Sequence, residues 1–183
     1  MTRIPLDPPR TVRSRLVDWY GRRQYGQVLD PGRAMAHNGR VLTSTLLHET
    51  LVGRWRSLDP TLKALAQMVP AATIGCSWCM DFGAMVSHHE GVAPRKILDI
   101  PVWRDSDAYT PLERQVMAFA EAMTQTPPTV TDEMVEGLRV HLSDGQLVEL
   151  TAMVALENQR SRTNAALGLT SQGFKATCDL ERV

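Results

Sequence analysis

Along most of the chain, apolar residues recur every three or four positions, which is the spacing that places them on one face of an α-helix. Runs in which apolar and polar residues alternate, as in half-buried strands, are scarce. No internal repeat or low-complexity linker divides the sequence. The pattern therefore predicts an all-α fold: one helical domain over residues 1–183 with about seven to eight helices.

Prolines and capping residues set the first boundaries. Residues 1–10 are rich in proline and are predicted to form an extended N-terminal arm, followed by a helix in "TVRSRLVDWYGRRQ". Asp30 and Asp59 each precede a proline, which pairs an N-cap acceptor with a residue suited to the first helical turn. Two helices are therefore expected to begin near 31 and 60, the first continuing through Leu51. Pro70 lacks a backbone donor and should end or kink the second helix.

The downstream helices have clear signals as well. Thr110 and Glu113 form a capping box at the start of "TPLERQVMAFAEAMT", whose apolar face includes Val116 and Phe119. Ser143 with Gln146 is the corresponding signal for a long helix. The other predicted helices cover residues 76–90, ended by Gly91, the segment "PRKILDI" from Pro94, the segment "TDEMVEGLRVHL", and the long helix up to Gly168.

Charge and hydropathy limit the possible partners. Twenty basic side chains balance twenty acidic ones, so no net field attracts nucleic acid or an anionic membrane surface. The apolar stretches are too short and too interrupted to cross a bilayer, and the N-terminus has no apolar run typical of a signal peptide. The sequence predicts a cytoplasmic protein with neither a nucleic-acid nor a membrane partner.

Three cysteines are present, at positions 76, 79 and 178. They are too few for a secreted disulfide framework, so the close pair Cys76 and Cys79 is interpreted as redox-active, with metal binding or simple core packing as alternatives. A zinc site needs four ligands, and the adjacent His88 and His89 would point about 100° apart on a helix. We therefore expect neither a metal nor a cofactor. Cys178 is either a stray thiol or a third partner in exchange.

Helical geometry suits the redox interpretation. Residues three apart lie about 60° apart on a helix, so Cys76 and Cys79 can form a disulfide without unwinding the turn. Near the start of a helix, free backbone N–H groups and the helix dipole favour a thiolate on the sulfur closest to the end. Pro70 and Gly75 are consistent with a helix that begins there.

The segment "QMVPAATIGCSWCMDFGAMVSHHEGVAPRKILDI" resembles the core of the carboxymuconolactone decarboxylase and alkylhydroperoxidase-D-like (AhpD-like) superfamily. "AMAHNGRVL" and "ENQRSRTNAALGL" are similar to flanking segments of many members, so the resemblance covers about residues 33–170. It implies an all-helical homo-oligomer, a dimer, trimer or hexamer. In members with the cysteine pair it implies peroxide reduction, with Cys79 as the attacking and Cys76 as the resolving thiol.

The chain departs from the peroxidase pattern of that superfamily at three positions. The pattern has a glutamate twelve residues before the first cysteine, a histidine just before the second and another four residues after it. This chain has Ala64, Trp78 and Gly83 there. Gly83 indicates either a pocket beside the pair, walled by Trp78 and Phe82, or tight helix packing.

A replacement base would have to come from another helix, because His88 and His89 lie too far along their own. His37 and His48 are eleven residues apart on one predicted helix, so both could point inward or both toward water. Glu157 would be the best substitute for the missing carboxylate if it were buried near the cysteines. It belongs to a polar run, for which a solvated face or a subunit contact is the alternative: Glu157, Arg160, Arg162 and Asn164.

These observations favour a thiol-dependent oxidoreductase that acts on a small-molecule peroxide or disulfide. Its reductant would be a small thiol or a protein dithiol. One alternative is a lyase acting on a small organic acid, in which Arg160 or Arg162 binds the carboxylate and a histidine moves the proton. The other is a non-catalytic helical oligomer whose cysteine pair serves packing or a redox-sensitive latch.

Overall fold

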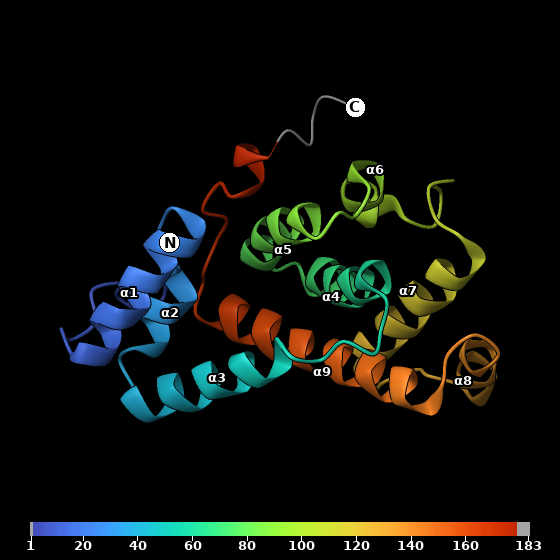
Figure 1. Cartoon of the computed structure of the whole chain (residues 1–183), viewed down its shortest axis with the longest axis horizontal. Coiled ribbons are helices and arrows are strands. Elements are labelled where there is room, and N and C mark those ends of the chain that lie inside the picture. The colour runs from blue at the N-terminus through green and yellow to red at the C-terminus, as the bar shows by residue number, and fades with distance from the viewer. Residues whose placement is uncertain (1, 179–183) are drawn as a thin grey trace. The chain divides into compact units, whose positions relative to one another are not determined.

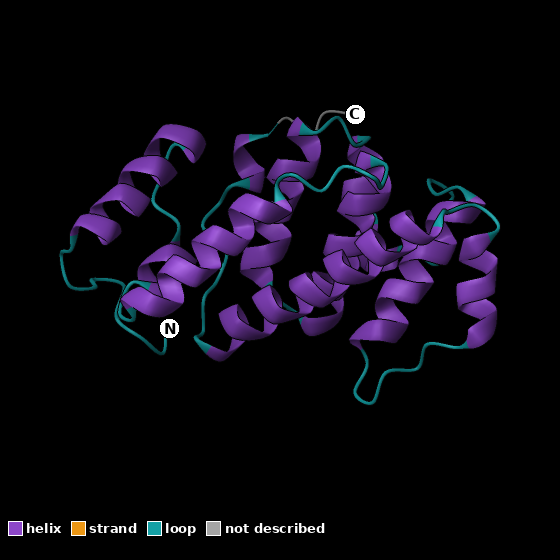
Figure 2. Ribbon diagram, turned by 60° about the horizontal axis from the view of Figure 1, so that its bottom comes forward, coloured by secondary structure: helices purple, strands orange, loops and turns teal. Residues whose placement is uncertain are grey.

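The computed structural model describes residues 2–178, and every regular element in that range is helical (Figure 2). The predicted all-α fold is therefore confirmed. None of the helices between residues 2 and 178 has the length and apolar character needed to cross a bilayer. The elements are α1 (Val12–Tyr25), α2 (Asp30–Met35), α3 (Gly39–Val52), α4 (Pro60–Ile74), α5 (Ser77–His89), α6 (Pro94–Leu98), η1 (Ile100–Val102), α7 (Pro111–Thr124), α8 (Asp132–Arg139), α9 (Asp144–Ala166) and η2 (Lys175–Thr177) (Figure 1).

Side chains cap several helices as predicted. The Thr110 hydroxyl accepts the backbone N–H of Glu113, and the Glu113 carboxylate accepts the N–H of Thr110. Asp59 accepts two N–H groups of the first turn of α4. Ser143 and Gln146 exchange the equivalent hydrogen bonds at the start of α9. Because these bonds satisfy donors that have no partner within the helix, each fixes the residue at which its helix begins.

The single helix predicted from residue 31 through Leu51 is wrong, because the chain forms α2 and α3 instead. Asn38 interrupts the helix with φ −123° and ψ 99°, and its side chain accepts the N–H groups of Arg40 and Val41. The local cap thus competes successfully with continuation of the helix. His37 consequently lies between the two helices, and His48 lies within α3.

Pro70 does not end its helix. α4 continues past Pro70 to Ile74, where Gly75 adopts the left-handed conformation with φ 78° and its N–H bonds back to the Ala71 and Ala72 carbonyls. Glycine adopts this conformation at no steric cost, so it terminates the helix. The predicted helix end shortly before the cysteines is therefore present, but a glycine cap produces it.

The chain forms two compact units. The first contains the described residues up to 55 together with 166–169, and the second contains 56–165 together with 170–178. In the second unit α4 contacts both α5 and α7, and α7 contacts α8 (Figure 1). The core of this unit is made of fully buried side chains, among them Leu65, Val116, Met117, Leu138, Leu150, Met153 and Val154.

The first unit contains α1, α2 and α3. Arg33 and Asp18 form an ion pair at 3.3 Å that joins α2 to α1. The apolar side chains at helical spacing in α1 and α3 do lie on helices. Most of them are nevertheless more than 40% exposed in the single chain. These exposed residues are Val12, Leu16, Trp19, Tyr20, Val41, Leu46, Leu47 and Leu51. When such side chains form a contiguous patch, the patch often marks an interaction surface.

Candidate functional site

The cysteine pair lies at the start of α5 and is joined by a disulfide bond. Cys76 is the N-cap residue of α5, and Cys79 lies in its first turn. Their Cα atoms are 5.3 Å apart, within the usual range for a disulfide. Both residues are buried, Cys79 at 6% exposed and Cys76 at 1%. The Gly75 turn after α4 thus delivers both sulfurs to one helix end, as the sequence predicted.

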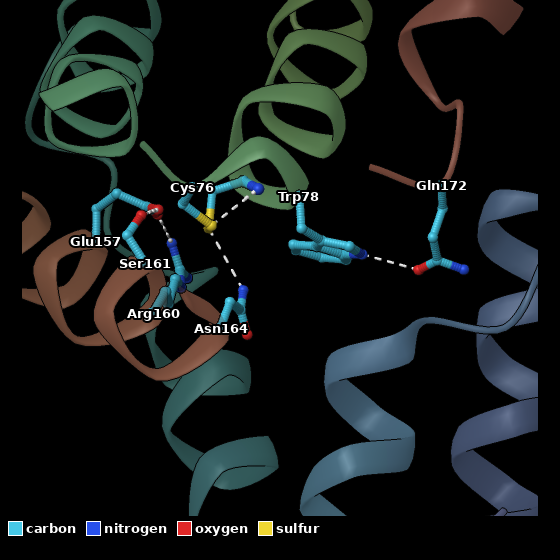
Figure 3. The surroundings of a disulfide bond; sticks show 8 residues. Cys76, Trp78, Glu157, Arg160, Ser161, Asn164 and Gln172 are labelled. Atoms are coloured by element: carbon cyan, nitrogen blue, oxygen red, sulfur yellow. Dashed lines mark hydrogen bonds and ion pairs between the residues drawn. A yellow bond between two sulfur atoms is a disulfide. The ribbon is translucent and has the colours of Figure 1, made fainter. Parts of the chain in front are cut away.

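Each sulfur accepts one hydrogen bond (Figure 3). The backbone N–H of Cys79 donates to Sγ of Cys76 at 3.2 Å, and Nδ2 of Asn164 donates to Sγ of Cys79 at 3.4 Å. A hydrogen bond to the charged form of a group stabilises that form, and the helix N-terminus adds to the effect at Cys76. After reduction of the disulfide, these contacts stabilise negative charge on the sulfurs, whereas the burial of both residues opposes it.

A buried polar face of α9 lies beside the disulfide (Figure 3). Glu157, Ser161 and Asn164 follow one another at intervals of four and three residues, so they share one face of the helix. All three are at most 5% exposed. The Ser161 hydroxyl donates to Glu157 Oε1 at 2.7 Å, and Arg160 lies 3.4 Å from Glu157 Oε2. A solvated face is therefore the wrong interpretation for Glu157 and Asn164.

Aromatic residues pack along α5 next to the pair. Trp78 stacks on Phe82 with ring centroids 4.8 Å apart, and Phe174 meets Phe82 edge-on at 5.2 Å. The Trp78 indole N–H points toward Gln172 and donates to its side-chain oxygen at 2.8 Å (Figure 3). These contacts hold residues 172–174, in the segment after α9, against α5.

Asp81 is the polar anchor of that segment. Its carboxylate accepts the backbone N–H groups of residues 172, 173 and 174 on Oδ2, at 2.8 to 3.0 Å, and the N–H of Lys175 on Oδ1 at 2.7 Å. Burial raises the pKa of Asp81, but hydrogen bonds from the backbone N–H groups of Lys175, Phe174 and Gln172 and from the Ser171 side chain outweigh burial and hold its pKa below the ordinary value for aspartate. The carboxylate therefore serves the fold and not the sulfurs.

Gly83 faces Met68 of α4. A Cβ atom at position 83 would lie 2.6 Å from Met68 Sδ, and Met68 is 2% exposed. Met68 thus fills the space where the peroxidase pattern has a histidine, so tight helix packing is the correct interpretation of Gly83. Ala64, at the position of the missing glutamate, is also buried.

The histidines have other surroundings. His37 is exposed, with Nε2 2.8 Å from the Pro5 carbonyl oxygen, and His48 is exposed beside Trp55. His88 and His89 lie at the far end of α5. A role for His37 or His48 at the cysteines stays a prediction, because both histidines belong to the first unit and the cysteines belong to the second.

Two further candidates from the sequence are Cys178 and a metal site. Cys178 is a free, partly exposed thiol. Among residues 2–178, no cluster of three or more histidine, cysteine, aspartate or glutamate side chains could hold a metal ion.

Sequence reasoning missed Ser161 and the contact between Asn164 and Cys79. The available signal was the spacing of positions 157, 161 and 164, which places three polar side chains on one helical face within the polar run 157–164. That spacing alone does not reveal whether the face is buried.

Comparison with known proteins agrees with this fold. YnjA, an uncharacterized protein of Escherichia coli K12, is 35% identical over 160 residues, which cover 85% of this chain and 86% of YnjA. An uncharacterized peroxidase-related protein of Ralstonia eutropha, with an alkylhydroperoxidase AhpD core, has a TM-score of 0.83 at 17% identity and 95% and 94% coverage of the two chains. The debrominase Bmp8 has a TM-score of 0.78 at 19% identity and 91% and 89% coverage.

These two structural likenesses establish the fold, while sequence similarity establishes the family. Residues 43–122 match the sequence model of the carboxymuconolactone decarboxylase family, and this range includes α4, the cysteine pair and α5. Together with the similarity to YnjA over most of both chains, the match shows that the chain belongs to the carboxymuconolactone decarboxylase family, within the AhpD-like superfamily.

Proposed function

We propose that this protein is a thiol-dependent oxidoreductase in which Cys76 and Cys79 alternate between a dithiol and a disulfide. The observation that carries the proposal is the pair itself: two bonded sulfurs at a helix N-terminus, each accepting a hydrogen bond that favours its thiolate. The likeness in fold to a peroxidase-related protein and to a debrominase adds support for an enzyme.

With a hydroperoxide as substrate, the Cys79 thiolate attacks the outer peroxide oxygen. An S–O bond forms, the O–O bond breaks, and the leaving alkoxide takes up a proton. The Cys76 thiolate then attacks the sulfur of the resulting sulfenic acid, so that the disulfide forms and hydroxide leaves as water after protonation. A small thiol or a protein dithiol returns the pair to the reduced state by exchange. A disulfide substrate would be reduced by the same two electrons.

The lyase alternative has less support. It needs an arginine to bind a substrate carboxylate, but Arg162 donates to the Thr124 carbonyl oxygen at 2.9 Å, and Arg160 lies within hydrogen-bond distance of Gln67 and Glu157. Both guanidinium groups are therefore already engaged within the protein.

The test of the oxidoreductase uses the full chain, reduced and freed of reductant, with one equivalent of hydrogen peroxide or cumene hydroperoxide. Alkylation and peptide mass spectrometry are expected to show a Cys76–Cys79 disulfide that dithiothreitol reverses. Cys178→Ser is the matched control and should behave like the parent, whereas Cys76→Ser should stop at a sulfenic acid on Cys79. If both thiols of the pair remain free after the oxidant is consumed, the proposal is wrong. Turnover of an organic acid by a protein lacking both cysteines would instead favour the lyase.

We also propose that the protein forms a homo-oligomer, with the exposed apolar side chains of α1 and α3 at the contact between copies. Residues such as Trp19 and Leu47 are 58% and 61% exposed in the single chain. Burying them against a second copy would gain hydrophobic free energy at about 25 cal/mol per Å² of apolar surface.

A further inference from the structure

Resting on the proposed function, we infer that Asn164 is a further catalytic residue. Its Nδ2 group holds the sulfur of Cys79, and its carbonyl oxygen Oδ1 accepts the O–H of the sulfenic acid that forms on that sulfur. This chain has Ala64, Trp78 and Gly83 at the three positions of the peroxidase pattern, and the Asn164 amide of α9 is a polar side chain that does contact the attacking sulfur.

The first observation is the direct contact with a reacting atom. Asn164 is 3% exposed, and its Nδ2 lies 3.4 Å from Sγ of Cys79, a residue 85 positions away in the sequence. Packing of α9 beside α5 therefore fixes the amide against this sulfur. An amide N–H binds a thiolate more strongly than a neutral thiol, because the acceptor carries the charge.

The second observation is an unpaired acceptor on the same side chain. Within residues 2–178, the buried side-chain oxygens that have no hydrogen-bond partner are Asn164 Oδ1 and Glu149 Oε1. Glu149 Oε1 lies 3.6 Å from the Lys63 ammonium group, so an opposite charge compensates it. Asn164 Oδ1 has no such compensation. An unpaired buried carbonyl oxygen is costly, which points to a donor that arrives during the reaction.

The reaction supplies such a donor at the right place. When the Cys79 thiolate attacks a hydroperoxide, the new S–O bond places an O–H group one bond away from the atom that Nδ2 contacts. Because Oδ1 and Nδ2 are bonded to the same carbon, an amide that touches Sγ also brings its oxygen near that O–H group. When Cys76 attacks the sulfur, the S–O bond breaks, hydroxide leaves and takes up a proton, and Oδ1 is again unpaired, as observed in the disulfide state.

The test uses a parent protein carrying Cys76→Ser and Cys178→Ser, so that Cys79 is the single thiol and its sulfenic acid persists. Asn164→Leu removes both polar atoms and keeps the branched arrangement of side-chain heavy atoms. We expect it to raise the pKa of the Cys79 thiol, measured by pH-dependent alkylation. We also expect it to slow sulfenic acid formation at pH 7 by about tenfold, equal to about 1.4 kcal/mol, measured by trapping with dimedone.

Asn158 provides the matched control on the same helix. Its Nδ2 donates to the Thr124 hydroxyl at 2.9 Å, so Asn158→Leu also removes a side-chain amide hydrogen bond but leaves Cys79 untouched. The Cys79 titration and the rate of oxidation should then equal those of the parent. Asn164→Ala, which also removes the donor and adds no charge, should raise the pKa of the Cys79 thiol and decides the question if Asn164→Leu does not fold.

The outcomes separate the two proposals. The role of Asn164 is refuted, while the oxidoreductase stands, if the parent forms sulfenic acid and Asn164→Leu matches it in both titration and rate. Asn164→Ala takes the place of Asn164→Leu in this comparison if the leucine variant does not fold. If the parent forms no sulfenic acid and the chain with both cysteines forms no disulfide, the oxidoreductase itself fails, and with it the role of Asn164.

Discussion

Asp81→Asn tests how the segment after α9 is held against α5. In the native protein, three backbone N–H groups bond to Asp81 Oδ2 and the N–H of Lys175 bonds to Oδ1. Asparagine keeps one carbonyl oxygen for the three donors but turns an NH₂ group toward the N–H of Lys175. One unpaired donor costs about 1–3 kcal/mol, and the remaining bonds lose their charge. We expect the free energy of unfolding to fall by about 3 kcal/mol at pH 7.

The pH dependence gives this prediction a second signature. Because the hydrogen bonds lower the pKa of Asp81 in the folded protein, its contribution is fully present above the unfolded pKa of about 3.9. That contribution is lost as the pH falls through the lower pKa of the folded state. The difference in stability between the native protein and Asp81→Asn should therefore be constant from pH 7 to about pH 5 and shrink below about pH 4.

Urea unfolding followed by circular dichroism at several pH values measures these differences. Amide hydrogen exchange at residues 173–175 reports separately on local release of the segment, which should be faster in Asp81→Asn. Asp105→Asn is the control, because Asp105 is exposed and such a change alters stability by less than about 0.5 kcal/mol. A variant that matches the native protein in both unfolding and exchange would refute the anchoring role of Asp81.

Three further changes test the packing and the surface. Gly83→Ala should lower the free energy of unfolding by roughly 1 kcal/mol, since overpacking against Met68 exceeds the gain in helix propensity. Met68→Ala in the same chain should cancel part of this added loss. Stabilisation by Gly83→Ala alone would contradict the prediction. Leu47→Glu should shift the mass measured by light scattering toward the monomer, and an unchanged mass would exclude α3 from the contact. Trp78→Phe should cost about 1 kcal/mol in urea unfolding, because the hydrogen bond to Gln172 is lost while stacking persists; equal stability would make that bond dispensable.

Local signals in the sequence were sufficient for most helix boundaries. Capping by Thr110 and Glu113 at α7 is a bond between residues three apart, so the residue types alone predict it. The interruption between α2 and α3 escaped prediction, although Asn38 is a good N-cap residue, because apolar spacing continues across it. Pro70 was expected to end or kink α4, while the left-handed Gly75 ends the helix.

Contacts between distant parts of the chain could not be predicted in the same way. Asp81 lies in α5 close to the cysteine pair, yet its partners are backbone groups more than ninety residues away in the sequence. Gly83 was compatible with both a pocket and close packing until Met68 was placed against it. Such choices depend on which helix lies opposite, and periodicity along one helix carries no information about its partner.

The sequence by itself determined that the chain is helical and that Cys76 and Cys79 share one helix end, because both follow from backbone geometry over a few residues. Only the tertiary structure decided what surrounds the sulfurs. It buried Glu157, Ser161 and Asn164 on α9 and brought the Asn164 amide to Cys79, because long-range packing selects which polar face of a helix is removed from water.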